Sequence, residues 1–207
     1  MGRIPVEWEV EKLAMLSDIS SGITLGKAYE GPDTIELPYL RVANVQDGYL
    51  DLTDIATIRL PKGQVKRFTL EVGDVLMNEG GDFDKLGRGT IWQGKIPLCL
   101  HQNHVFKVRT YRNKLLPEFL EMVSQSPYGK KFFIISSKQS TNLASINSTQ
   151  LKAFRIPLPD LTEQRNIVTC FSSLNKNYNT ETTELKKLQS LKTGLMQDLL
   201  SGKVRVK

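Results

Sequence analysis

Long apolar runs are missing from this chain of 207 residues, and no stretch approaches the roughly 20 residues that a membrane-spanning helix needs. The opening residues 1–5 lack an apolar stretch behind their positive charge, which argues against a secretory signal. Cysteine is equally scarce, because Cys99 and Cys170 alone cannot form a disulfide framework. Together these absences predict a folded protein of the cytoplasm.

Catalytic motifs are also missing. The chain has neither the Asn-Pro-Pro-Tyr motif with which enzymes flip and methylate a base nor a glycine-rich turn for a methyl-donor cofactor. The segment 81–88 is spaced one residue too long for a phosphate loop, and Arg88 replaces the Lys-Ser/Thr pair of that motif. Glu79, Asp82 and Asp84 could offer carboxylates to a metal, but no lysine follows them in a nuclease-like pattern. We therefore predict neither a catalytic residue nor a metal site in this segment.

Zinc ligands could come from one predicted strand, which contains Cys99, His101 and His104. Cys99 and His101 share a face of that strand, whereas His104 points the other way. Histidines that are packed or hydrogen-bonded within the strand explain this spacing better than a zinc site does.

The net charge of +6 is unevenly distributed. Residues 1–160 contain 20 Lys and Arg against 18 Asp and Glu, whereas residues 161–207 contain 8 against 4. Such a surplus is compatible with a nucleic-acid partner, because neutralised phosphates supply much of the affinity for DNA. A solvated surface rich in lysine explains the surplus equally well.

The first 160 residues predict a mixed α+β domain. Short runs rich in β-branched and aromatic residues, separated by turns such as Asp47-Gly48, predict strands at 37–42, 57–60, 75–77, 89–92, 98–100 and 105–108. Helices are expected at 11–19, 117–124 and 127–135, the second with Pro117 in its first turn. The polar stretch 136–150 is expected to be a linker.

A long helix is expected after Pro159, which cannot lie inside a helix, with Thr162 as its N-cap. At 1.5 Å per residue it would extend for about 57 Å, to Leu199. Two sets of residues recur along it at heptad spacing: Ile167, Leu174, Glu181, Leu188 and Leu195, and Phe171, Tyr178, Leu185, Lys192 and Leu199. Eight of these ten are apolar, and so narrow an apolar stripe has to pack against a partner helix.

Two polar residues interrupt the stripe, Glu181 and Lys192. They are either tolerated there or they fix the register and orientation of a partner helix. Their midpoint lies between Lys186 and Lys187, so a two-fold axis at that point would place Glu181 opposite Lys192 of a second copy. This spacing favours antiparallel pairing.

Two polar loops are the main candidates for binding. The glycine-rich segment 78–89 lies between predicted strands, and its glycines would let a partner approach the backbone while Lys85 and Arg88 contact phosphates or a guanine edge. The second loop contains side chains suited to base edges: Lys138, Gln139, Ser140, Thr141 and Asn142. A long hairpin with a mobile tip and an ordinary solvated loop are the respective alternatives.

Two basic residues outside these loops are weaker candidates for DNA contact. Lys27 ends the polar segment 20–27, and Arg41 follows a predicted strand. Asn44, close to Arg41, is expected to buttress the core through hydrogen bonds.

Segments along nearly the whole chain follow one order: Pro5-Val6-Glu7-Trp8, residues 38–45, residues 70–78, Lys85-Leu86-Gly87-Arg88 with Trp92, residues 103–109, residues 156–159, Glu163-Gln164 and residues 195–205. In this order they resemble a target-recognition domain and a helical spacer of type I restriction–modification specificity subunits. On this basis we divide the chain into a DNA target-recognition domain (1–158), a spacer or dimerisation helix (159–202) and a basic tail (203–207).

The resemblance implies a DNA-reading protein without catalysis of its own. In that family each recognition domain reads one half of a split target, and the helices hold two domains apart. Separate modification subunits dock on this scaffold and methylate adenine with S-adenosylmethionine, and a restriction subunit can join them. This chain is then expected to bind no cofactor itself.

This chain is smaller than a typical member of the family, which has two recognition domains and two spacer helices. This chain is therefore either a half-subunit that dimerises or a fragment. Its stripe of eight large apolar side chains, each worth roughly 1.5–3 kcal/mol when buried, favours an antiparallel homodimer. The two-fold symmetry of such a dimer predicts a gapped, inverted-repeat target.

A protein-interaction adaptor is the alternative function, with the helix bound to a partner helix and the loops in contact with protein. A metal-dependent nuclease is a third hypothesis, which requires bound metal and cleavage by the chain alone. Salt separates the first two, because DNA binding weakens steeply as salt rises whereas an adaptor has no such DNA term.

Overall fold

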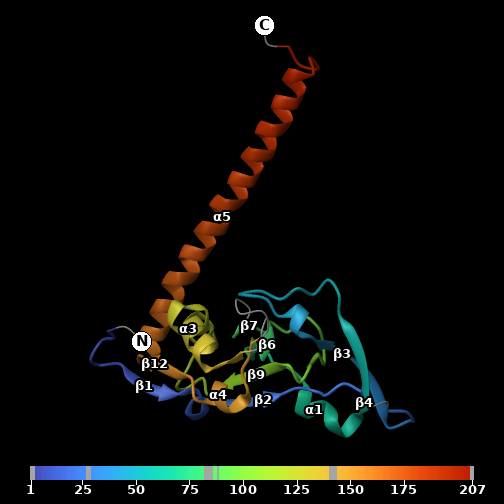
Figure 1. Ribbon diagram of the computed structural model, residues 1–207, viewed down its shortest axis with the longest axis vertical. Helices are drawn as coiled ribbons and strands as arrows, with labels where there is room; N and C mark the ends of the chain where they lie inside the picture. Colours follow the sequence, from blue (N-terminus) through green and yellow to red (C-terminus); the bar gives the residue numbers. More distant parts are fainter. Residues whose placement is uncertain (1–2, 27–28, 82–85, 88, 140–143, 206–207) are drawn as a thin grey trace. The chain divides into compact units, whose positions relative to one another are not determined.

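The computed structural model describes residues 3–26, 29–81, 86–87, 89–139 and 144–205. It divides into two compact units, residues 1–165 and 166–207, which we describe one at a time (Figure 1). The strands of the first unit are β1 (Glu9–Lys12), β2 (Ser17–Ser21), β3 (Thr34–Leu40), β4 (Ala56–Pro61), β5 (Val75–Asn78), β6 (Gly80–Gly81), β7 (Gly89–Ile91), β8 (Leu100–His101), β9 (Val105–Thr110), β10 (Lys138–Gln139), β11 (Ala144–Ser145) and β12 (Arg155–Leu158). Its helices are α1 (Val65–Phe68), α2 (Pro117–Gln125), α3 (Pro127–Ser136) and α4 (Ser148–Lys152), with 3-10 turns at Leu13–Met15, Val42–Asn44 and Lys62–Gln64.

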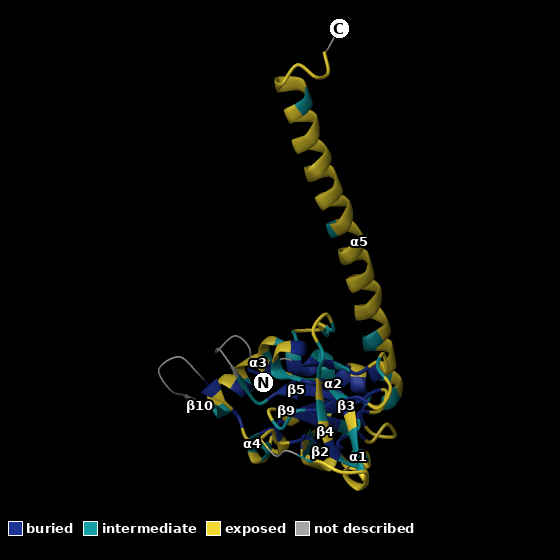
Figure 2. Ribbon diagram, turned by 90° about the vertical axis from the view of Figure 1, so that its right-hand side faces the viewer, coloured by how far each residue is buried: buried dark blue, intermediate teal, exposed yellow. Residues whose placement is uncertain are grey.

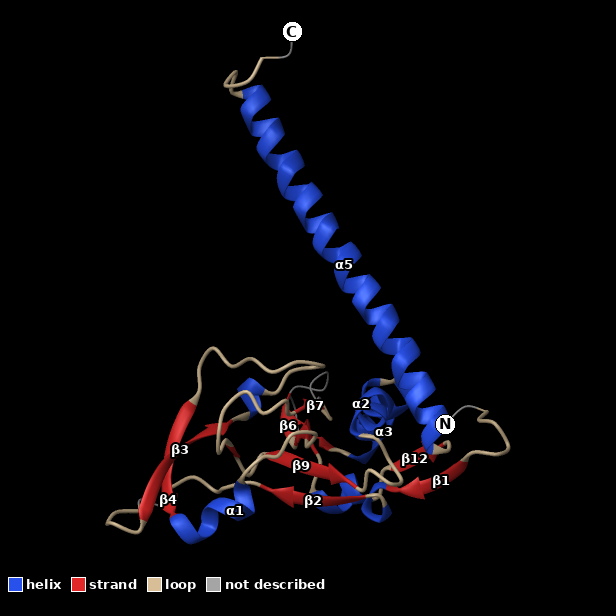
Figure 3. Ribbon diagram, turned by 180° about the vertical axis from the view of Figure 1, so that it is seen from behind, coloured by secondary structure: helices blue, strands red, loops and turns tan. Residues whose placement is uncertain are grey.

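A four-stranded antiparallel sheet, in the order β2-β9-β5-β7, forms the centre of the first unit (Figure 3). All four residues of β5 are buried, because this strand is paired on both sides and reads Val-Leu-Met-Asn. Leu76 of β5 packs in a core with Leu40, Trp92 and Val105. This core packs against β5, the strand that leads into the first candidate loop.

A second sheet, in the order β4-β3-β8, lies beside its own apolar core of Leu37, Leu60 and Leu100. Lys107 connects this region to the central sheet. Its ammonium group donates to the carbonyl oxygens of Arg67 (3.3 Å) and Thr69 (3.2 Å) at the end of α1. Burial lowers the pKa of Lys107, and these two acceptors compensate for part of the lost hydration.

Helix α2 covers the edge of the central sheet at β7. The side chain of Gln125 donates to the carbonyl oxygen of Gly89 (3.1 Å), and Glu121 accepts hydrogen bonds from Thr90 and from the backbone of Ile91. Burial raises the pKa of Glu121. These polar side chains replace the missing neighbour strand, and so they protect an edge that could otherwise pair with another chain.

The first turn of α5 (Leu161–Leu200) is attached to the first unit by a buried glutamine. The side-chain amide of Gln164 donates to the carbonyl oxygens of Lys114 and Pro159, and its oxygen accepts from the amide of Leu116, each at 2.9 Å. The indole of Trp8 donates to Glu163 (3.0 Å). The Glu163-Gln164 pair of the sequence motif therefore fixes where the long helix begins.

Asp160, and not Thr162, caps this helix. Its carboxylate accepts hydrogen bonds from the amides of Thr162 (2.8 Å) and Glu163 (2.9 Å). The prediction of Thr162 as N-cap is therefore wrong by two residues, because the helix begins at Leu161 and a cap must precede it.

The predicted strands are confirmed to within a few residues, as are the two helices that begin at Pro117 and Pro127. The helix predicted at 11–19 is wrong: this segment contains the end of β1, a 3-10 turn and most of β2. Pairing decides the outcome, because β1 joins β12 and β2 joins β9. The expected linker 136–150 also contains structure, namely β10, β11 and the start of α4, whose Asn147 and Gln150 form a capping box.

The second unit consists of α5 from residue 166 onward and the segment that follows it. Its surface is exposed along nearly its whole length (Figure 2). Among the described residues, α5 included, no helix combines the length and the apolar character needed to span a membrane.

Candidate nucleic-acid interface

The two candidate loops meet in one small sheet. Strand β6, at the beginning of the glycine-rich loop, pairs with β11, and β11 pairs with β10. The register places Gly81 opposite Ala144 and Lys138 opposite Ser145. Two segments that are about 60 residues apart in the sequence therefore start from one common base, which no local pattern in the sequence indicated.

The described glycines of the first loop serve the protein's own packing. A Cβ on Gly80 would lie 2.9 Å from the carbonyl oxygen of Ala144, and one on Gly89 would lie 2.5 Å from that of Leu76. Gly87 has a φ of 65°, and a side chain there would collide with the ring of Phe133. These glycines therefore let both ends of the loop pack closely against the rest of the unit, and the close approach of a partner, which the sequence suggested for them, stays a prediction.

Side chains at the end of β5 join three segments around the base of this loop. The amide of Asn78, itself buried, donates to the carbonyl oxygen of Val45 (2.9 Å). His104 Nδ1 lies 2.5 Å from a carboxylate oxygen of Glu79. The backbone amide of Ile146 donates to the carbonyl oxygen of Glu79 (2.8 Å), which holds the chain after β11 against the same point.

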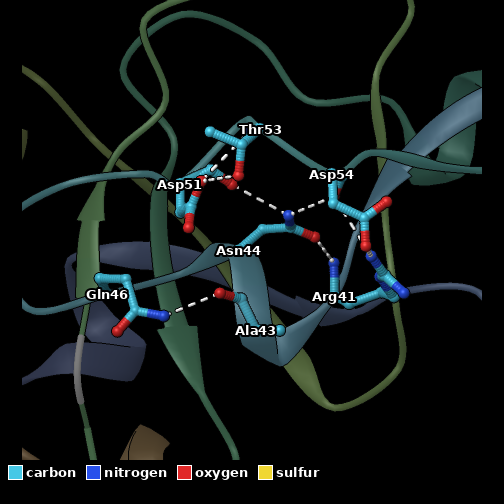
Figure 4. Close-up of polar contacts among 7 residues, drawn as sticks. All are labelled: Arg41, Ala43, Asn44, Gln46, Asp51, Thr53 and Asp54. Atoms are coloured by element: carbon cyan, nitrogen blue, oxygen red, sulfur yellow. Dashed lines mark hydrogen bonds and ion pairs between the residues drawn. The ribbon is translucent and has the colours of Figure 1, made fainter.

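Hydrogen bonds among Arg41, Asn44, Asp51 and Asp54, here called the polar clasp, connect the two ends of the segment between β3 and β4 (Figure 4). The oxygen of Asn44 accepts from the amide of Arg41 (2.8 Å), and its NH₂ group donates to the carbonyl oxygens of Asp51 and Asp54, each at 2.9 Å. The guanidinium of Arg41 binds the carboxylate of Asp54 (2.7 Å). The carboxylate of Asp51 accepts from the hydroxyl of Thr53 (2.6 Å), and that bond lowers the pKa of Asp51. The prediction that Asn44 buttresses the core is confirmed.

Two carboxylates in this part of the first unit have basic partners. Asp54 pairs with Arg41 and Asp47 with Lys130 (3.1 Å). Pairing reduces the negative potential that would repel phosphates, and so it favours an anionic partner at this surface. Ion pairs this exposed contribute little to stability.

The predicted DNA-contacting residues divide into three groups. Lys138 is exposed on β10, and Gln139 belongs to the same strand. Arg41 belongs to the clasp, so it would reach DNA only as part of a pair with Asp54. The remaining predicted residues lie outside the described part of the chain: Lys27, Lys85, Arg88, Ser140, Thr141 and Asn142.

The alternative zinc ligands are placed where they stabilise the fold. Burial raises the pKa of the Cys99 thiol to about 12, which disfavours the thiolate that zinc requires. His101 is fully buried, and its Nδ1 donates to the carbonyl oxygen of Val105 (2.7 Å). Burial lowers the pKa of His101 to about 4, so its ring is neutral near pH 7. Within the described residues, no cluster of three potential ligands is present.

The apolar stripe of α5 is exposed. Seven of its eight predicted residues are at least 36% accessible: Phe171, Leu174, Tyr178, Leu185, Leu188, Leu195 and Leu199. Ile167, the eighth, is partly buried. Leu191 and Met196, which are also more than half exposed, widen the apolar surface toward the carboxyl end of the helix.

Comparison with known proteins assigns the family. The model of the type I restriction modification DNA specificity domain matches residues 5–192, and the chain belongs to this family. It is 30% identical over 203 residues to a protein of Methanocaldococcus jannaschii assigned as the MjaX type I restriction enzyme specificity subunit, with 97% of this chain and 47% of that protein covered. The chain thus spans about half the length of this curated relative.

Solved structures show the same fold. A chain from a type I restriction–modification system superposes with a TM-score of 0.66 at 18% identity, covering 97% of this chain and 46% of that one. The HsdS subunit of Thermoanaerobacter tengcongensis gives a TM-score of 0.61 at 17% identity, with 95% and 45% covered. The predicted fold, a mixed α+β domain followed by a long helix, is confirmed.

Proposed function

We propose that this chain recognises DNA as a specificity component of a type I restriction–modification complex and performs no catalytic step of its own. One observation carries the proposal: the two polar loops, 78–89 and 138–142, share one sheet as their base in a domain of the DNA specificity family. The paired carboxylates nearby support an anionic partner. Lys138, Gln139 and Arg41, together with the loop residues named from the sequence, are the proposed contacts.

The long helix is proposed to pair with the helix of a second copy, antiparallel. A two-fold axis between Lys186 and Lys187 brings residues of the stripe together in layers: Leu185 with Leu188, Glu181 with Lys192, Tyr178 with Leu195 and Leu174 with Leu199. Six of the eight apolar stripe residues thus meet an apolar partner from the stripe, and the two charged residues meet each other, whereas Ile167 and Phe171 fall opposite residues beyond Leu200. This self-complementarity is what an isologous interface requires.

In this arrangement the homodimer reads a split target and carries modification subunits. Two identical recognition domains related by a two-fold axis would read a gapped inverted repeat. Methyl transfer to adenine from S-adenosylmethionine belongs to the partner modification subunits in this proposal, and a restriction subunit is a further proposed partner.

The test is to express the chain with a type I modification subunit from the same genome and to map adenine methylation across the host DNA. A gapped inverted repeat methylated on both strands is the expected result. If the complex forms, no new methylation appears and the purified complex shows no salt-sensitive binding to DNA, DNA recognition is wrong and the adaptor function is supported.

A further inference from the structure

The hairpin Val45–Leu50 is part of the same surface, although the sequence identified only its turn. Val45 and Leu50 form an antiparallel bridge, and the amide of Gln46 donates to the carbonyl oxygen of Tyr49 (3.0 Å). Gly48 adopts a φ of 80°, which the tight turn requires. Tyr49 lies next to this turn with 61% of its surface exposed.

Three contacts from other elements hold this hairpin. The amide of Gly48 donates to the carbonyl oxygen of Gly89 (3.3 Å), the last residue of the glycine-rich loop segment. The carboxylate of Asp47 pairs with Lys130 of α3, and Asn78 binds the carbonyl oxygen of Val45. The hairpin is therefore fastened to the end of the first candidate loop and to the strand from which that loop departs.

The clasp of Figure 4 holds the other end of the same segment. Asn44 precedes the hairpin and binds the carbonyl oxygens of Asp51 and Asp54, which follow it. Because both ends are closed by buried or part-buried hydrogen bonds, Tyr49 is presented on an ordered support. An exposed aromatic side chain on such a support is typical of a binding surface, since it offers a large contact area and loses only two side-chain torsions on binding.

We infer that the hairpin Val45–Leu50 is a third DNA-contacting segment and that Tyr49 is its contact residue. The inference rests on the DNA-recognition function proposed above. A phenol suits DNA at this place: its ring packs on a deoxyribose or a thymine methyl group, and its hydroxyl donates to a phosphate oxygen. The neighbouring Asp47 does not oppose the contact, because Lys130 neutralises it.

A photo-crosslinking amino acid at position 49 tests the contact directly, in the complex with the modification subunit and on target DNA identified by methylation mapping. Position 111 is the matched control. Tyr111 is also exposed (39%) and directly follows the Thr110 end of β9, whereas Asn78, at the start of the first candidate loop, lies opposite Val105 at the other end of that strand. We expect DNA crosslinks from position 49 and none from position 111.

Affinity gives the second readout. Tyr49→Ala is expected to weaken target binding about tenfold, the value of one good contact, without changing the melting temperature because the side chain is exposed. Tyr49→Phe assigns the contact: affinity near that of the wild type assigns it to the ring, and a loss equal to that of alanine assigns it to the hydroxyl.

The outcomes separate the two proposals. A wild-type complex that binds its target, with no crosslink from position 49 and no loss in Tyr49→Ala, overturns this inference and leaves DNA recognition intact. A wild-type complex that does not bind DNA at all contradicts the proposed function itself.

Discussion

The two units of this chain differ in how their exposed apolar side chains are distributed. In the first unit, large exposed apolar side chains are scattered over separate segments, as with Val6, Val72 and Leu98. Such isolated cases are normal for folded proteins. On α5 they recur at heptad spacing from Phe171 to Leu199 and are exposed, and among residues 166–205 no second helix or strand is present to cover them. The first unit buries an apolar core among its own elements, whereas the apolar stripe of α5 is exposed, which is the observation behind the helix pairing proposed above.

Substitution of the two leucines at the centre of the apolar stripe should have the largest effect on dimer stability. In the proposed dimer, Leu185 and Leu188 face each other across the two-fold axis, so Leu185→Lys with Leu188→Lys removes four leucines from the interface. At roughly 1.5–3 kcal/mol each, about 6–12 kcal/mol of dimer stability is lost, and multi-angle light scattering should report a monomer. The first unit should melt at an unchanged temperature.

The control places the same charges on the opposite side of the helix. Thr183 and Ser190 are exposed and lie away from the stripe. Thr183→Lys with Ser190→Lys should leave the dimer intact. A dimer that survives the leucine substitutions would place the interface elsewhere and would remove the contrast between the two units.

A smaller effect should appear as a loss of unfolding free energy of the first unit when the pH falls. The pKa of His101 is lowered to about 4 by burial, and its Nε2 finds no hydrogen-bond partner among the described residues. Lys107 and Arg109 nearby lower that pKa further, while the bond to Val105 and the charge of Asp74 raise it. Between pH 6.5 and about 4 the unfolded chain binds a proton that the folded chain does not, so stability decreases with falling pH.

The expected loss of unfolding free energy is about 3 kcal/mol across that window, measured by urea denaturation at several pH values. His101→Gln should flatten the dependence. His104→Gln should preserve it, because His104 is an exposed side chain and the only other histidine of the chain. Equal pH dependence in wild type and His101→Gln would show that other groups control acid stability.

Local pattern was enough to predict much of this fold. Alternating and apolar runs indicated the strands, and the heptad repeat with Pro159 before it indicated α5. The helix predicted at 11–19 is wrong because the structure of this segment is decided by pairing with strands far along the chain. The amide of Leu13 binds the carbonyl oxygen of Phe154, and Ser17 lies opposite Thr110. Tertiary pairing of this kind overrides local helical propensity.

The candidate interface was predictable in its parts and not in its assembly. Polar and glycine-rich composition identified both loops, but only the pairing of β6 with β11 shows that they share a base. The hairpin with Tyr49 was missed because an Asp-Gly turn is a common signal with no functional content. Its contacts to Gly89 and Lys130 cross the fold and leave no mark at the level of sequence.

The layer formed by Glu181 and Lys192 tests the register of the proposed helix pair, and here we expect the smallest effect on dimer affinity. In the proposed register Glu181 faces Lys192 of the second copy twice per dimer. Glu181→Lys places lysine against lysine, and Lys192→Glu places glutamate against glutamate, so each variant alone should dimerise about tenfold more weakly.

A mixture of the two variants should form a heterodimer, because each variant then supplies the charge that the other lacks. Analytical ultracentrifugation of the mixture measures this rescue. In a parallel pair each position would face its own copy, so the wild type would already place Glu181 against Glu181 and Lys192 against Lys192, and either substitution alone would exchange one like-charge pair for another without weakening the dimer. Weakening by each variant alone, followed by rescue on mixing, is therefore the result expected of an antiparallel helix pair centred between Lys186 and Lys187, whereas single variants that dimerise as well as the wild type would contradict that register.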